Sequence, residues 1–121
     1  MLVTLPRKGG NMKILVVEDN RFWQARLIQW LTQLGHTVVA TAYDQSSALK
    51  ATEENVPELV TMDGKLIGEK GLDIARAIRE LYPNIQILMI SGEGDEFEGK
   101  GLCKEEFRFE QLGEYIMRNF K

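Results

Sequence analysis

The chain of 121 residues has few of the residues that define several protein classes. Cys103 is the only cysteine, so no disulfide can form within the chain and no second thiol can help to hold a metal cluster. We expect a small, buried or half-buried side chain there and a reducing, cytoplasmic setting. His36 is the only histidine and lies at a predicted turn between a helix and a strand, which argues against a histidine-based metal site.

An excess of basic residues and a long apolar run are also missing. The formal net charge is -3 at pH 7, whereas a surface that binds nucleic-acid phosphates carries an excess of Lys and Arg, so we expect no direct nucleic-acid binding. No apolar run approaches the roughly 18 residues of a membrane span. The first residues also lack the order of a secretory signal, so we expect no membrane association. We predict a flexible leader at 1–12 and one domain at 13–121.

Short apolar runs alternate with helical patterns along the chain. This alternation predicts an α/β fold, with a parallel sheet and helices on both of its faces. The ten residues 92–101 hold four glycines and a single apolar residue, so no full helix is expected there. The predicted strands are 13–17, 37–42, 58–62, 85–90 and a short edge strand at 102–103; the predicted helices begin after Asn20, after Asp44 or Ser46, before Ile74 with Leu81 in its apolar stripe, and at Glu110.

Polar side chains follow three of these runs, where each predicted strand ends. They are Glu18-Asp19, Asp63 and Ser91. Because the carboxyl ends of parallel strands meet at one edge of a sheet, we expect these groups to share a site. Three clustered carboxylates repel one another unless a cation lies among them, and Mg²⁺ suits an open cluster of this kind. The Ser91 hydroxyl and the Lys104 ammonium would complete a site able to position a phosphoryl group.

Each motif also has a simpler interpretation. Acids before a helix interact favourably with its N-terminus, so Glu18 and Asp19 alone could serve only the helix that follows. Asp63-Gly64 and Ser91-Gly92 are common turn dipeptides. The acidic stretch 93–98 is typical of a solvated loop, with a weak second cation site or the repulsion of partners as alternatives. It is the joint placement of the motifs at strand ends that favours a shared site.

These motifs together resemble the receiver domain of two-component response regulators, over roughly Lys13 to Phe120. The sequence KILVVEDN at 13–20 is similar to the opening strand of the family with its paired acids. Asp63 matches the phosphoacceptor, Gly71 the glycine of the following loop, and Ser91 the switch Ser/Thr. The resemblance implies a flavodoxin-like, doubly wound sheet of five parallel strands in the order 2-1-3-4-5. The fourth helix of that fold would be shortened or missing here.

The resemblance also implies a phosphorelay function. Asp63 would accept a phosphoryl group from a histidine kinase or phosphotransfer protein, and Ser91 and Lys104 would contact that group. A downstream effector protein would bind differently to the phosphorylated domain. The domain itself would be a monomer or weak dimer. It would catalyse only its own phosphorylation and dephosphorylation. Mg²⁺ would be held by Glu18, Asp19, Asp63 and the backbone carbonyl of Lys65.

Departures from the family pattern cluster after Ser91. Only 13 positions separate Ser91 from Lys104, fewer than in typical receivers. The family's Lys-Pro-Phe is replaced by Lys104-Glu105-Glu106-Phe107, so Lys104 matches only with one extra residue after it, and a strict register puts Glu105 in the place of the lysine. Lys100 is therefore the alternative for the family's lysine. The usual switch aromatic falls on Gly101, and the proline usual in the loop after the acceptor is Ile67.

These departures favour a second hypothesis, a pseudo-receiver that signals by protein contacts without phosphorylation. A flavodoxin-type nucleotide binder is disfavoured, because no glycine-rich phosphate loop follows the first strand.

Overall fold

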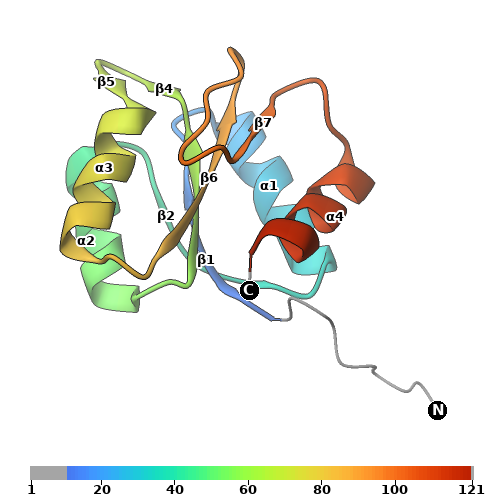
Figure 1. Cartoon of the computed structure of the whole chain (residues 1–121), viewed down its shortest axis with the longest axis horizontal. Helices are drawn as coiled ribbons and strands as arrows, with labels where there is room; N and C mark the ends of the chain where they lie inside the picture. Colours follow the sequence, from blue (N-terminus) through green and yellow to red (C-terminus); the bar gives the residue numbers. More distant parts are fainter. Residues whose placement is uncertain (1–10, 121) are drawn as a thin grey trace.

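Five apolar runs form one parallel sheet in the computed structural model, which describes residues 11–120 (Figure 1). The sheet has the order β2-β1-β3-β6-β7, which is the predicted flavodoxin-like order. All neighbouring strands are parallel, as the alternation of strands and helices requires. The strands are β1 (Lys13–Val17), β2 (Thr37–Ala42), β3 (Leu59–Asp63), β6 (Gln86–Ser91) and β7 (Gly101–Cys103).

Helices cover both faces of this sheet, so the molecule has three layers. Figure 1 shows α1 (Arg21–Gln33) and α4 (Phe109–Asn119) on one face, and α2 (Gln45–Asn55) and α3 (Gly71–Leu81) on the other. The predicted Asn20 cap is confirmed, since its side chain accepts a hydrogen bond from the Trp23 N–H at 3.0 Å. Of the two possible caps of α2, Asp44 is the one used.

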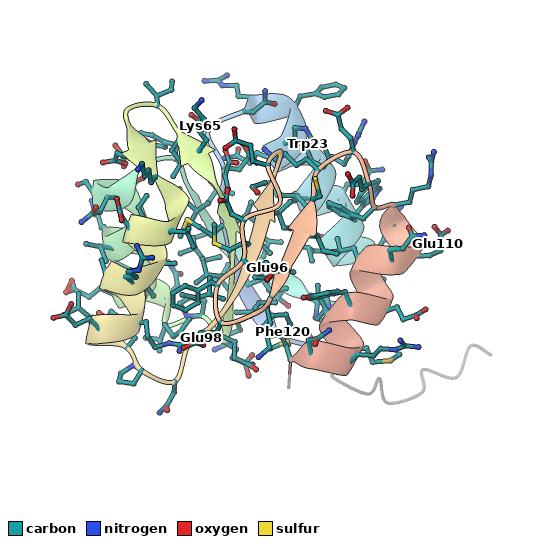
Figure 2. All side chains as sticks on the ribbon, turned by 45° about the horizontal axis from the view of Figure 1, so that its top comes forward. Trp23, Lys65, Glu96, Glu98, Glu110 and Phe120 are labelled. Atoms are coloured by element: carbon teal, nitrogen blue, oxygen red, sulfur yellow. The ribbon has the colours of Figure 1, made fainter. Side chains whose placement is uncertain are left out.

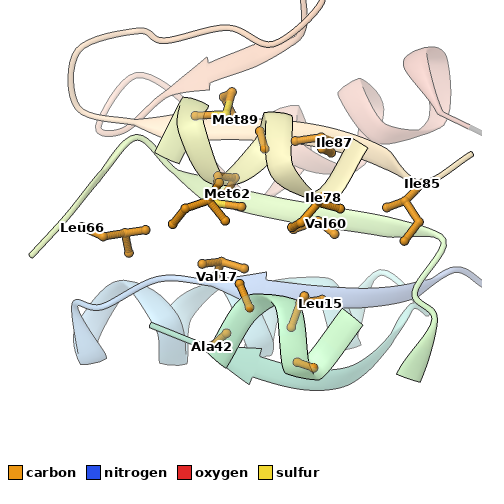
Figure 3. Packing of buried hydrophobic residues seen from close by; sticks show 14 residues of the cluster. Leu15, Val17, Ala42, Val60, Met62, Leu66, Ile78, Ile85, Ile87 and Met89 are labelled. Atoms are coloured by element: carbon orange, nitrogen blue, oxygen red, sulfur yellow. The ribbon is translucent and has the colours of Figure 1, made fainter. Parts of the chain in front are cut away.

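The central strands are buried on both faces, which explains their continuous apolar runs. In β1, Leu15 and Val17 join the cluster beneath α2 and α3, while Ile14 and Val16 join the cluster beneath α1 and α4. Figure 3 shows the first of these clusters, with side chains from β1, β3, β6 and α3 packed together. Because both faces are dry, the strand ends that these clusters hold are rigidly placed.

Two sequence expectations need correction. Met12 was assigned to the leader, but it is only 2% exposed, and its carbonyl accepts a hydrogen bond from the Thr37 N–H at 2.9 Å. Pairing with the start of β2 therefore orders the chain before Lys13; residues 1–10 of the predicted leader lie outside the described part. Leu81 was placed in the buried stripe of α3, but it is 62% exposed, and the next residue, Tyr82, packs against the cluster beneath α2 and α3 in its place.

The loop after Asp63 contains a small hairpin that the sequence did not indicate. Strands β4 (Lys65–Leu66) and β5 (Glu69–Lys70) pair antiparallel, with Gly68 between them at a φ of +74°. Two-residue strands give no periodic signal, so the glycines alone suggested a loop.

Residues 92–100, here called the 92–100 segment, take the place of a helix between β6 and β7. Phe97 and Lys100 form an isolated antiparallel bridge, and Phe97 packs against the cluster beneath α2 and α3. Arg79 of α3 contacts the segment twice: its Nη1 donates to Glu98 Oε2 at 2.6 Å, and its guanidinium lies 5.2 Å from the Phe97 ring centre. The prediction of a shortened or missing fourth helix is confirmed. Among residues 11–120, no helix is long and apolar enough to cross a membrane.

Candidate functional site

The carboxyl edge of the sheet brings the predicted polar residues together. Asp63 and Ser91 are the last residues of β3 and β6, one position later than the predicted strand ends. Glu18 directly follows β1, and its N–H donates to the Ala42 carbonyl at 2.9 Å, which extends the ladder to β2. The Lys104 N–H donates to the Ser91 carbonyl at 2.6 Å and so extends the ladder from β7 to β6. Regular strand pairing thus fixes the backbone of all four residues.

An open cavity of about 310 Å³ lies at this edge. Figure 2 shows Trp23 of α1 and Lys65 at the start of β4, both at this end of the molecule. Among the residues that line the cavity, Glu18 is 1% exposed, Asp63 is 5% exposed and Ser91 is 2% exposed, so its floor is almost dry. The lining residues are Glu18, Asp19, Asn20, Asp63, Lys65, Ser91, Gly92, Glu93, Asp95 and Lys104.

Three carboxylates meet in this cavity. One oxygen from each of Glu18, Asp19 and Asp63 lies within 4.8 Å of the other two. Asp19 Oδ2 also accepts a hydrogen bond from the Ile67 N–H at 2.9 Å, which ties this carboxylate to the β4–β5 hairpin. A proline at position 67 could not make this bond, because it has no N–H. The departure from the family pattern at Ile67 therefore orients one of the clustered acids.

Lys104 is the basic partner of these acids. Its Nζ lies 2.8 Å from Glu18 Oε1 and 3.2 Å from Asp63 Oδ1, whereas Lys100, the alternative, lies over the Phe120 ring at 5.3 Å. The extra residue after Lys104 is absorbed by a tight turn, in which Glu105 has a φ of +72° and the Glu106 N–H donates to the Cys103 carbonyl. The displaced sequence position of Lys104 thus still delivers its ammonium to the site.

Burial and mutual charge shift the pKa values of this cluster. Burial raises the pKa of Glu18 to about 7, and the neighbouring Asp63 carboxylate adds to the rise, while Lys104 opposes it. Burial alone would lower the pKa of Lys104, but its contacts with Glu18 and Asp63 outweigh this effect and raise it. At Glu18, burial and the neighbouring acid therefore outweigh the single ammonium of Lys104.

A divalent cation fits these residues. Glu18 Oε1 is buried and makes no hydrogen bond of good geometry, although Lys104 Nζ lies close to it. Buried carboxylate oxygens need either a full set of donors or a metal. Hard oxygen donors in an open cluster are the ligands that Mg²⁺ prefers. The acidic cluster could therefore hold a metal ion. Lys65 lines the same cavity, and the role of its carbonyl as a ligand stays a prediction.

Two glycines are required by the close packing around the acceptor. A Cβ on Gly71 would collide with the Asp63 carbonyl, and the Gly71 N–H donates to the Gly64 carbonyl at 2.9 Å. A Cβ on Gly64 would collide with the Asp95 carboxylate and with Ser91. The glycine expected in the loop after the acceptor thus has a steric reason in this structure.

Asp95 is the residue that sequence reasoning missed. It was assigned to a solvated loop, but its N–H donates to Ser91 Oγ at 2.8 Å and its side chain lines the cavity beside Gly64. The only available signal was the spacing of four residues between Ser91 and Asp95 in a short, glycine-rich stretch. The other acids of the stretch 93–98, Glu93, Glu96 and Glu98, are exposed as expected, although Glu93 also lines the rim of the cavity.

Known proteins match both the sequence and the fold. The transcriptional regulatory protein TorR of Escherichia coli O157:H7 is 36% identical over 86 residues, which are 70% of this chain and 36% of TorR. The chemotaxis protein CheY of Thermotoga maritima is 29% identical over 84 residues, which cover 69% of this chain and 70% of CheY. The chain therefore spans about a third of the length of TorR.

The solved structures agree. The receiver domain of the Erythrobacter litoralis PhyR response regulator superposes with a TM-score of 0.78 at 23% identity, over 90% of this chain and 89% of that domain, which shows the shared fold. The sequence profile of the response regulator receiver domain matches residues 14–107, well over half of the chain. The protein therefore belongs to the response regulator receiver domains of two-component systems.

Proposed function

We propose that this receiver domain accepts a phosphoryl group on Asp63 and that the modified site changes the binding of an effector protein. One observation carries the proposal: the Asp63 carboxylate lies at the floor of the cavity, beside two further acids and 3.2 Å from the Lys104 ammonium. This combination supplies a nucleophile, a place for a cation and a fixed positive charge.

In the proposed transfer, a carboxylate oxygen of Asp63 attacks the phosphorus of a phosphohistidine on a histidine kinase or phosphotransfer protein. A P–O bond forms while the P–N bond breaks, and the imidazole leaves with the electron pair and takes up a proton. Glu18, Asp19, Asp63 and the Lys65 carbonyl would hold Mg²⁺, which would supply positive charge to reduce the repulsion between the carboxylates and the incoming phosphoryl oxygens.

The other residues position the phosphoryl oxygens. Lys104 can exchange its contact with Asp63 for a contact with a phosphoryl oxygen, since its Nζ already lies at the acceptor. The Ser91 hydroxyl accepts from the Asp95 N–H, so its own hydrogen remains available to donate to a phosphoryl oxygen. The expected setting is the cytoplasm, where a partner kinase presents its phosphohistidine.

The second candidate is a pseudo-receiver that signals without phosphorylation. The observation in its favour is Gly101, which stands where the switch aromatic is expected and whose N–H donates to the Tyr115 hydroxyl at 3.0 Å. No aromatic side chain at this position can follow a movement of Ser91. Without this aromatic side chain, phosphorylation of Asp63 would not be transmitted from Ser91 to the protein surface through position 101.

Incubation with Mg²⁺ and acetyl phosphate, followed by intact-mass spectrometry, separates the two candidates. The wild-type chain should gain one phosphate and Asp63→Asn should gain none. Asp73→Asn is the matched control, because it removes an acid from the exposed surface of α3 and should leave the modification unchanged. Absence of phosphate on the wild-type chain, together with unchanged Trp fluorescence on addition of beryllofluoride, would reject phosphotransfer and favour the pseudo-receiver.

A further inference from the structure

We propose that Asp95 competes with the phosphoryl group for the Ser91 side of the cavity, so that occupation of the site displaces the 92–100 segment. This inference rests on the proposed phosphotransfer to Asp63. In this proposal the charge of Asp95 responds to occupation of the site, and the 92–100 segment is the part of the chain that moves.

The Asp95 carboxylate lies close to the acceptor. It packs against Gly64, the residue after the acceptor, so closely that any side chain at position 64 would collide with it. Ser91, the proposed donor to the phosphoryl group, lies against the same point of Gly64. The Asp95 carboxylate and Ser91 therefore meet at one point, against the residue that follows the acceptor.

The cavity that Asp95 lines is rich in acidic side chains. The cavity already contains Glu18, Asp19 and Asp63, and the carboxylate of Asp95 is not among the three that converge to within 4.8 Å. Asp95 thus lies beside the candidate cation cluster and not within it. A phosphoryl group on Asp63 would carry up to about two negative charges in place of the single charge of the carboxylate, in the same cavity of about 310 Å³. Like charges at such short range repel, so the Asp95 carboxylate and the phosphoryl group disfavour each other.

Contacts with β7 and, through Phe97, with α3 connect Asp95 to the rest of the fold. Its carbonyl lies directly against Gly101, the first residue of β7, where a Cβ would collide with it. Two residues further on, Phe97 is half-buried against the core and lies beneath the Arg79 guanidinium of α3. A displacement of Asp95 must therefore move or strain its contacts with β7 and α3. Figure 2 shows this segment on the outside of the sheet, with Glu96 and Glu98 on it.

The test is the affinity for beryllofluoride, a stable phosphoryl mimic, measured at saturating Mg²⁺ by Trp fluorescence. Trp23 is a suitable reporter because its ring lies 5.3 Å from Lys104 Nζ. Asp95→Asn keeps the size and the backbone N–H of the residue and removes only its charge. We expect the half-saturating concentration to fall by about fivefold, the effect of one unit charge a few ångströms away in a water-like medium.

Glu96→Gln is the matched control, since it removes the same charge from the next, exposed residue outside the cavity. Screening by solvent should keep its affinity within about twofold of the wild type. Equal affinities of Asp95→Asn and the wild type would overturn the inference while leaving the proposed function intact. Weaker binding by Asp95→Asn would also overturn it, because the carboxylate would then be helping to hold the cation. A wild-type chain that binds no beryllofluoride would reject the proposed function itself.

Amide hydrogen exchange gives a second readout that does not depend on affinity. In the free protein the Asp95 N–H is held by Ser91 Oγ at 2.8 Å and should exchange slowly. Addition of Mg²⁺ and beryllofluoride to the wild type should speed exchange in residues 94–98, whereas the centre of β3 should stay protected. Unchanged or slower exchange in that segment would contradict its displacement.

Discussion

The site is built from two regions that differ in regularity. From β1 to β6 the chain repeats strand and helix units, and the acids Glu18 and Asp63 sit at strand ends between two dry clusters. From residue 92 to α4 it has only the three-residue strand β7, yet it supplies Lys104 and Asp95. The regular part therefore fixes the reactive acids, whereas the irregular part brings the charged side chains that can adjust to them.

Core substitutions should show the largest contrast between the two regions. Ile78 of α3 is fully buried, so Ile78→Ala should lower the free energy of unfolding by about 2–5 kcal/mol through lost burial and a cavity. Phe97 of the 92–100 segment is only half-buried, so Phe97→Ala should cost about half as much or less, despite the larger side chain removed. Urea denaturation measures both. An equal cost would mean that the segment is as much a part of the core as α3.

The pH dependence of stability should trace to the regular region. Because the pKa of Glu18 is raised from 4.5 to about 7, the unfolded chain releases this proton at lower pH than the folded chain. The protonated Glu18 side chain thus contributes its full share to the free energy of unfolding below pH 4.5. This share is lost as the pH rises to about 7, and the loss is about 1.4 kcal/mol for each unit by which folding raises the pKa. Urea denaturation in the presence of a chelator should show this decline. In Glu18→Gln the decline should be absent; its persistence there would assign it to another group.

Lys104 tests whether the irregular region contributes to binding. Lys104→Met keeps an unbranched side chain of similar length and removes the ammonium that contacts Glu18 and Asp63. We expect beryllofluoride affinity to fall tenfold or more, since a hydrogen bond to a charged group is worth about 1.5–3 kcal/mol. Lys100→Met is the control, because Lys100 lies over Phe120 instead. Similar losses in the two variants would indicate a general effect of charge and not a contact of Lys104.

Asp19 should give the smallest effect, limited to the cation. Asp19→Ala removes one of the three clustered oxygens and also some of their repulsion, so Mg²⁺ affinity should fall about tenfold while the fold persists. Titration of Trp fluorescence with Mg²⁺ measures the affinity, and a thermal unfolding curve checks the fold. If Asp19→Ala unfolds the chain, a structural role of this carboxylate replaces the metal role.

The sequence anticipated most of the regular region and much less of the irregular one. Buried parallel strands give continuous apolar runs, and the Asn20 cap and the turn at Gly35, with its φ of +95°, are local signals. The β4–β5 hairpin gave no signal, because each of its strands has only two residues. Leu81 was misjudged because spacings of three and of four both fit a helical stripe: Tyr82, four residues after the buried Ile78, packs against the core instead.

Residue patterns were enough to predict the parallel sheet and the placement of Glu18, Asp63 and Ser91 at one edge, because each apolar run ends where its strand ends and parallel strands end at the same edge. The tertiary structure alone decided which lysine serves the site and that Asp95 enters it. These contacts join residues from separate strands and loops, and they depend on a turn at Glu105 and on the small size of Gly64. Such distances are set by the packing of the whole domain, which no local pattern of residues encodes.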